Sequence, residues 1–137
     1  MRVVFDTNVL VSALIKTGKP RELFSLAADG RVQLVLSKSL LEELIVTIDE
    51  PRIRKYADKG TIDIFLNVLS SSSKIVRVKS KFNVVKEDPD DDAVLGTAFD
   101  GKAEYIVSGD KHLLALGEFK GIKIVNITEM LSVVKNP

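Results

Sequence analysis

Val3-Val4-Phe5-Asp6-Thr7-Asn8 is the stretch that decides the fold, because an apolar run passes through a carboxylate directly into a helix start. An apolar run with β-branched residues is typical of a strand buried on both faces of a parallel sheet. Thr7 and Asn8 are both good helix N-caps, and the apolar residues 9–15 follow them without a loop. This order puts Asp6 at the carboxyl edge of the sheet, where open α/β folds bind ligands. Asp6 is therefore a candidate for chemistry, and capping of the helix is the simpler alternative.

The same order of strand and then helix recurs along the chain. Further strands are expected at residues 32–36, 74–81, 103–107 and 122–125, and helices at 9–15, 21–28, 38–48, 51–57, 62–69, 89–99, 111–116 and 129–134. The expected N-caps of four of these helices are Ser37, Thr61, Asp88 and Thr128. In the helix 38–48 the apolar face holds Leu40, Leu41, Leu44, Ile45 and Ile48. Repeated units of this kind predict a parallel sheet with helices on both faces.

Composition restricts the kind of site that this chain can build. The 137 residues, 45% of them hydrophobic and 28% charged, fit a single compact domain over residues 1–137. The chain has no cysteine and only one histidine, His112, so any metal must be held by oxygen ligands, which favours Mg²⁺ or Mn²⁺. We find neither a signal-peptide pattern nor a long apolar span and expect a cytoplasmic protein without a membrane segment.

Charge is distributed unevenly in the second half of the chain. From Lys74 to Lys86 there are five basic residues and no acidic one, and the next six residues, 87–92, are all acidic except Pro89. Residues 74–81 alternate in the manner of an edge strand, whose basic residues either protect the edge or contact RNA. Asp88-Pro89 is a helix start, and the helix dipole stabilises carboxylates in the first turn. Four aspartates in five residues nevertheless repel one another unless a cation lies among them.

In a parallel sheet with these connections, four acidic groups converge on one edge. They are Asp6, either Glu42 or Glu43, the aspartates near Asp91, and Asp110, which follows the strand at 103–107. Helical periodicity does not choose between Glu42 and Glu43, because both lie beside the apolar face at similar angles. A site of this kind binds hard divalent cations, and two such ions ~3.5–4 Å apart can activate a water and stabilise the leaving oxygen of a phosphodiester.

These residues carry a family resemblance. Four blocks, residues 3–10, 37–44, 88–98 and 105–114, resemble the PIN domain in order and spacing, most closely the VapC-like toxins of prokaryotic toxin–antitoxin pairs. The resemblance implies a three-layer α/β/α sandwich with about five parallel strands. It also implies an Mg²⁺- or Mn²⁺-dependent ribonuclease acting on single-stranded RNA, a homodimer, and an antitoxin partner.

The resemblance also implies roles for particular residues. Asp6, Glu43, Asp91 and Asp110 match the family's catalytic, metal-binding acids, and Asp91 is placed by the alanine seven residues later, Ala98. Asn8 and Ser108 match the polar residues that orient those acids. Asp92 stands where a metal ligand, direct or through water, is often found.

Two other families of enzyme share the opening pattern of a strand that ends in an aspartate but need further acids that this sequence lacks. A dehalogenase-like phosphotransferase needs a second aspartate where Asn8 stands, and a response-regulator receiver needs an acidic pair after the first strand and an aspartate after the third. An inactive PIN-like module that binds RNA or protein, and a PIN nuclease of RNA processing without an antitoxin, remain alternatives. His112 is interpreted as structural or surface, and Arg52, Arg54 and Lys55 as a solvated helix face rather than a phosphate contact.

Overall fold

The computed structural model describes residues 1–84 and 89–137. The expected N-cap Asp88 and its neighbours Lys86 and Glu87 lie outside the described residues. The helix expected after Asp88 begins at Pro89, as predicted. Within the described ranges no helix combines the length and the apolar character that crossing a bilayer requires.

The strands form one mixed sheet in the described part of the chain. They are β1 (Arg2–Phe5), β2 (Gln33–Ser37), β3 (Ser73–Val76), β4 (Tyr105–Val107), β5 (Glu118–Phe119) and β6 (Ile122–Val125). Their order across the sheet is β3-β2-β1-β4-β6-β5, and all neighbours pair in parallel except β5, which is antiparallel to β6. The predicted parallel sheet is confirmed. Strand β5 was not predicted, because two residues next to Gly117 give no periodic signal.

Strand β1 lies in the middle of the sheet and is buried on both faces. Val3 and Val4 are fully buried, and Phe5 is 2% exposed. Val3 and Phe5 join one hydrophobic core, and Val4 joins the other. Because side chains alternate along a strand, a central strand between two helical layers must be apolar at successive positions, which is the pattern that identified it.

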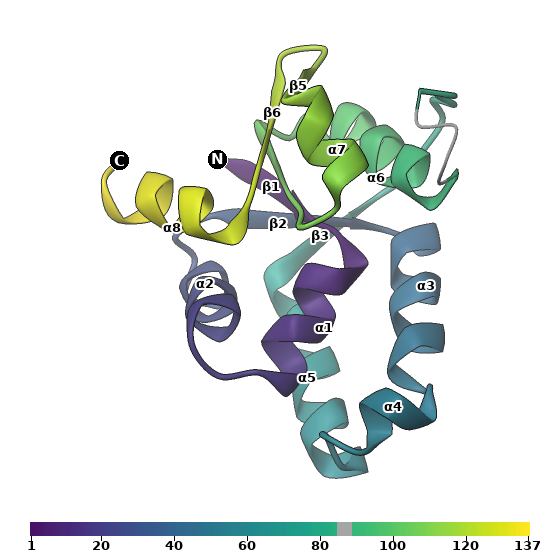
Figure 1. Ribbon diagram of the computed structural model, residues 1–137, viewed down its shortest axis with the longest axis vertical. Helices are drawn as coiled ribbons and strands as arrows, with labels where there is room; N and C mark the ends of the chain where they lie inside the picture. Colours follow the sequence, from purple (N-terminus) through teal and green to yellow (C-terminus); the bar gives the residue numbers. More distant parts are fainter. Residues whose placement is uncertain (85–88) are drawn as a thin grey trace.

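Helices cover both faces of the sheet, which confirms the three-layer α/β/α architecture (Figure 1). They are α1 (Thr7–Ile15), α2 (Lys19–Ala28), α3 (Lys38–Ile48), α4 (Pro51–Arg54), α5 (Lys59–Ser72), α6 (Pro89–Asp100), α7 (Lys111–Leu116) and α8 (Ile127–Lys135). Helices α6 and α7 pack on one face, and α1, α2 and α5 lie below the other face in the view of Figure 1. Because β1 to β4 and β6 are parallel, their carboxyl ends lie at the same edge of the sheet, where the chain passes into the following helices.

Two helix caps differ from the sequence-based expectation, because Asp58 caps α5 in place of Thr61 and Asn126 caps α8 in place of Thr128. In both cases an Asp or Asn slightly upstream accepts from the N–H three residues on. At α1 the cap is Asp6, one of the two roles expected for it, and Thr7 and Asn8 are the first helical residues. The expected cap Ser37 of α3 is confirmed.

Two expected details of packing are wrong. Ile45, placed on the apolar face of α3, is 49% exposed, because the buried stripe of that helix is narrower and consists of Leu40, Leu44 and Ile48. Strand β3 is at the sheet edge, as predicted, but it ends at Val76 and does not continue to Lys81. The chain leaves the sheet there because Asp100 of α6 accepts the N–H groups of Lys79 and Ser80.

Candidate active site

A small polar cavity opens at the carboxyl edge of the sheet. Its volume is about 40 Å³, and it is lined by Asp6, Thr7, Asn8, Glu43, Asp91, Val94 and Asp110. These residues come from the end of β1 and the start of α1, from α3, from α6, and from the turn between β4 and α7. The four acids that were expected to meet therefore line one cavity, although they are up to 104 positions apart in the sequence, from Asp6 to Asp110.

Asp6 stabilises the start of α1 and also lines the acidic cavity. Its Oδ1 accepts from the Val9 N–H at 2.9 Å and caps α1, and its Oδ2 accepts from the Ser108 hydroxyl. The side chain is 6% exposed and lines the cavity. Asp6 therefore both caps α1 and lines the acidic cavity, so the two roles expected as alternatives occur together.

Burial raises the pKa of Asp6 above its usual value. The loss of solvation is the largest cause, and the negative charge of Asp110 adds to it. Hydrogen bonds from Ser108, Val9 and Asn8 act in the opposite direction but do not cancel it. Asp6 is thus a carboxylate whose negative charge lacks full compensation within the protein.

Asp110 is held by the first turn of α7. Its Oδ1 accepts from the His112 N–H at 2.8 Å and from the Leu113 N–H at 3.1 Å. Burial acts to raise the pKa of Asp110, but the hydrogen bonds from Leu113, Asp91 and His112 outweigh it, so the pKa lies below its usual value. Asp91 is thus one of the groups that act on Asp110, which couples two of the four acids.

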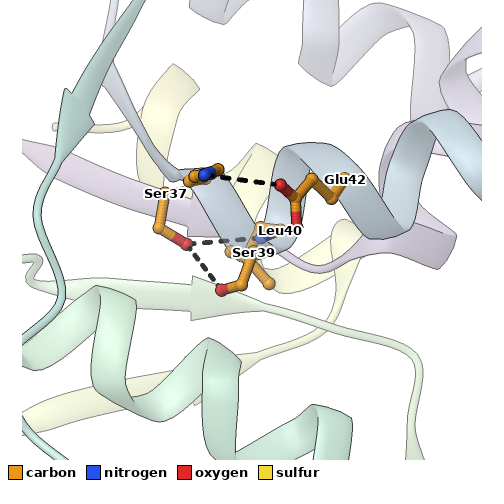
Figure 2. Close-up of polar contacts among 5 residues, drawn as sticks. Ser37, Ser39, Leu40 and Glu42 are labelled. Carbon is orange, nitrogen blue, oxygen red and sulfur yellow. Dashed lines mark hydrogen bonds and ion pairs between the residues drawn. The ribbon is translucent and has the colours of Figure 1, made fainter.

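The structure distinguishes the two glutamates of α3. Glu43 is half-buried and lines the acidic cavity. Glu42 is exposed and turns toward the start of its own helix, where Lys38 Nζ lies 3.9 Å from its Oε1 (Figure 2). Figure 2 also shows Ser37 Oγ in contact with Ser39 and Leu40, the local bonds that begin this helix. Glu43 therefore lies where the family resemblance puts it, a choice that helical periodicity alone left open.

Ser108 and Asn8 differ in how they meet the acids. Ser108 is fully buried, donates to Asp6, and accepts from the Asp110 N–H at 2.9 Å. It thereby links two of the four acids through one hydroxyl. Asn8 lines the cavity with an exposed side chain, and its backbone N–H is one of the groups that lower the pKa of Asp6.

Asp92 lies next to the cavity and does not line it. Its Oδ1 accepts from the Val84 N–H at 2.9 Å, which ties the segment before α6 to the first turn of that helix. Metal binding by Asp92 stays a prediction, and the structure gives this carboxylate a separate structural contact.

Thr7 is a residue of the cavity that sequence reasoning treated only as a possible cap. It is 6% exposed, and its Oγ1 is buried and has no hydrogen-bond partner among the described residues. The signal available in the sequence was its position directly after Asp6, at the end of a central strand.

The donor set fits a hard divalent cation in kind. The cavity offers carboxylates and a hydroxyl, which are the ligands that Mg²⁺ and Mn²⁺ prefer. Across residues 1–84 and 89–137, however, no three acidic or histidine side chains are positioned to hold a metal ion as they stand. Both carboxylate oxygens of Asp6 already accept hydrogen bonds from Val9 and Ser108, so binding an ion requires side chains to adjust.

Other charged groups that the sequence singled out have structural partners. His112 is half-buried, and its backbone N–H donates to Asp110 while its imidazole helps to lower the pKa of Asp110. Arg52 is paired with Glu50 at 2.6 Å and Arg54 with Asp49 at 3.9 Å. These pairs agree with the interpretation of that helix as a solvated face.

Known proteins resemble this chain over most of its length. A family model described as PIN domain matches residues 2–112. A protein of Methanocaldococcus jannaschii, the uncharacterised protein MJ1680, is 37% identical over 130 residues, which cover 93% of this chain and 83% of that protein.

Two solved structures share the fold. PAE2754 from Pyrobaculum aerophilum has a TM-score of 0.67 at 14% identity, covering 100% of this chain and 91% of the other. VapBC2 from Rickettsia felis, bound to a DNA fragment from their promoter, has a TM-score of 0.64 at 17% identity, covering 92% of this chain and 98% of the other. At these identities the likeness concerns the fold alone.

Proposed function

The chain belongs to the PIN domain family, and on that premise we propose that it is a metal-dependent endoribonuclease that hydrolyses phosphodiester bonds of single-stranded RNA. The observation that carries the proposal is the cavity itself, where Asp6, Glu43, Asp91 and Asp110 from four separate elements come together. Membership of the family supports a nuclease. The all-oxygen donor set supports a hard divalent ion.

Asp6, Glu43, Asp91 and Asp110 would hold Mg²⁺ or Mn²⁺, with Asp92 as a further ligand, direct or through water. A bound divalent ion supplies an activated water and positive charge for the leaving oxygen of the phosphodiester. The protein fixes the orientation of two acids before any ion arrives, since Ser108 and Val9 hold Asp6, and His112 and Leu113 hold Asp110. Asn8 and Ser108 are proposed to orient the acids.

Electrostatics supports the proposal that an ion is needed before a phosphodiester can enter the cavity. Four carboxyl groups around a cavity of about 40 Å³ repel a phosphodiester, which is itself an anion. The raised pKa of Asp6, caused mainly by its burial, supports this view for one of the four acids. We therefore propose that the ion neutralises the acids and that the carboxylates in turn fix its position.

We further propose that the enzyme is the toxin of a toxin–antitoxin pair, that it acts in the cytoplasm, and that it forms a homodimer. The shared fold with the Rickettsia VapBC2 structure supports the toxin role. A PIN nuclease of RNA processing without an antitoxin is the second candidate. A small DNA-binding protein encoded beside this gene would favour the first over the second.

The test is cleavage of a labelled single-stranded RNA by the purified protein with Mn²⁺ or Mg²⁺, with and without EDTA. We expect cleavage that EDTA abolishes. Glu43→Gln is expected to lower the rate by about 10²-fold or more, while Glu42→Gln, the matched change one residue away on α3, leaves the rate within about twofold. RNA that stays intact with every metal would favour the inactive binding module, and loss of activity in Glu42→Gln alone would refute the assignment of Glu43.

A further inference from the structure

The basic stretch before α6 has a conformation that protection of a sheet edge does not explain. Strand β3 ends at Val76, so Arg77, Lys79 and Lys81 lie beyond the hydrogen-bonded edge of the sheet. Edge protection therefore accounts for Lys74 but not for these three residues. We call Arg77, Lys79 and Lys81 the basic strip.

The basic strip keeps the alternation of a strand without belonging to one. Arg77, Lys79 and Lys81 are exposed, and the residues between them, Val78 and Ser80, are half-buried. In extended chain, residues two apart are separated by roughly 6.6 Å on the same side. The strip thus presents three exposed cations at alternate positions, and within the described residues none of the three forms an ion pair.

Contacts with α6 hold the strip in this shape. Asp100 Oδ2 accepts from the N–H groups of Lys79 and Ser80 at 2.7 Å each, and its Oδ1 accepts from the Ser80 hydroxyl at 2.7 Å. The backbone approaches Gly96 so closely that a Cβ there would lie 3.3 Å from the Ser80 carbonyl oxygen. These contacts use the backbone and the side chain of Ser80, and the three cationic side chains stay exposed, with the charge of Lys79 also helping to lower the pKa of Asp100.

A third contact fixes the far end of the segment. The ring of Phe82 packs edge-to-face against Phe99 of α6 and Phe119 of β5, with centroids 5.4 Å and 4.9 Å apart. The segment is therefore anchored on both sides of Lys81. The backbone that carries these cations is therefore ordered before any ligand binds. Binding a chain of phosphates would then cost less conformational entropy than binding to a flexible loop.

Both ends of the segment reach the elements that carry the acids. Arg77 lines a groove of about 410 Å³ with Ser37, Lys38 and Glu42 at the start of α3, the helix of Glu43. At the other end, the Val84 N–H donates to Asp92, the neighbour of Asp91. The segment thus runs from the start of α3, the helix of Glu43, along α6, the helix of Asp91.

We propose that the basic strip is the surface along which single-stranded RNA lies on its way into the acidic cavity, with Arg77, Lys79 and Lys81 each contacting a backbone phosphate. This inference rests on the proposed function and names how the substrate is held. The cations at alternate positions match a flexible polyanion, since an extended single strand presents its phosphates at regular intervals. The apolar side chains of Val76 and Val78 in the same groove offer a surface for a base or ribose.

The test measures binding separately from cleavage. Fluorescence anisotropy of a labelled single-stranded RNA is recorded in EDTA over a range of salt concentrations for the wild type and for R77Q/K79Q/K81Q. The control K16Q/R31Q/K123Q also removes one arginine and two lysines from exposed positions. We expect the strip variant to bind about 10- to 100-fold more weakly and its salt slope to fall by about 2, because each phosphate contact to a single strand contributes ~0.7. The RNA affinity of the control variant is expected to stay within about twofold of the wild-type affinity.

Equal binding by the wild type and the strip variant, or equal losses in the strip and control variants, would overturn the proposal. So would a wild type that binds no RNA. A wild type that binds through the strip but cleaves nothing with Mn²⁺ or Mg²⁺ would refute the proposed nuclease function while leaving the strip as an RNA-binding surface. Glutamine keeps the backbone N–H that Asp100 accepts, and a thermal melt of each variant checks that the fold persists.

Discussion

At the scale of single residues, Asp6 both stabilises the fold as a helix cap and destabilises it as a buried charge in the proposed metal site. Its Oδ1 stabilises the start of α1, yet its burial next to Asp110 raises its pKa. A carboxyl group whose folded pKa is raised costs stability as the pH rises through its unfolded pKa and up to its folded one. At neutral pH without metal the ionised Asp6 therefore destabilises the fold, and a bound cation would reverse that effect.

We predict that Asp6→Asn raises the Tm in EDTA at pH 7. Asparagine keeps the oxygen that caps α1 and removes the buried charge, and a gain of roughly 3–5 °C corresponds to about 1 kcal/mol in a domain of this size. The gain should shrink as the pH falls toward 4, where the wild-type carboxyl takes up its proton. Thermal melts from pH 4 to pH 8 provide the measurement, and a variant less stable than the wild type at pH 7 would show that the hydrogen bonds to Asp6 outweigh its desolvation.

Whether the sequence could assign a residue to the site depended on whether the residue follows a strand or lies within a helix. Asp6 and Asp110 follow apolar strands, and in a parallel sheet that position alone indicates the carboxyl edge. Glu43 lies on a helix where periodicity gave no choice, and Asp91 is one of several neighbouring aspartates, so both needed the family resemblance. Thr7 was not singled out, because a hydroxyl that lacks a partner only becomes visible once the packing around it is known.

At the scale of elements, one carboxylate at the end of α6 determines the path of the chain after β3. Asp100 accepts three hydrogen bonds from Lys79 and Ser80. The Ser80 N–H, the Ser80 hydroxyl and the Lys79 N–H, in that order, lower the pKa of Asp100 below its usual value. The stabilisation from a lowered carboxyl pKa is present above the unfolded pKa and is lost as the pH falls through the folded one.

We predict that Asp100→Ala frees this segment while the sheet stays intact. The amides of Lys79 and Ser80 should exchange with deuterium about tenfold faster or more, because their acceptor is gone. In Asp100→Asn, which keeps a neutral acceptor, the exchange rates of these amides should lie between those of the wild type and those of Asp100→Ala. Hydrogen exchange read by NMR measures the effect, and unchanged protection of both amides in Asp100→Ala would contradict the role of Asp100.

The elements themselves were predictable where local signals were strong. Helices α3 and α7 and strand β6 have the bounds that their apolar patterns and flanking residues indicated. The caps Asp58 and Asn126 were missed because several capping residues stand close together, and only the side-chain geometry decides among them. Strand β3 is shorter than predicted because a tertiary contact, from Asp100, overrides the alternating pattern of residues 77–81.

At the scale of the whole molecule, the topology builds the site. In the order β3-β2-β1-β4-β6-β5, strands β1 and β4 are neighbours, so Asp6 and the turn with Ser108 and Asp110 meet directly. Helices α3 and α6 then bring Glu43 and Asp91 from the two faces of the sheet. The fold persists at 14% identity to PAE2754, because the apolar pattern and the connections between elements define the fold.

The central claim is that the four acids hold a divalent ion in the cavity, and the most direct measurement is anomalous X-ray diffraction from crystals soaked with Mn²⁺. We expect an anomalous peak at the carboxyl edge of β1 and β4, within direct ligand distance of at least two of Asp6, Glu43, Asp91 and Asp110, with water completing its coordination. No peak at saturating Mn²⁺, or a peak only elsewhere on the surface, would contradict the account.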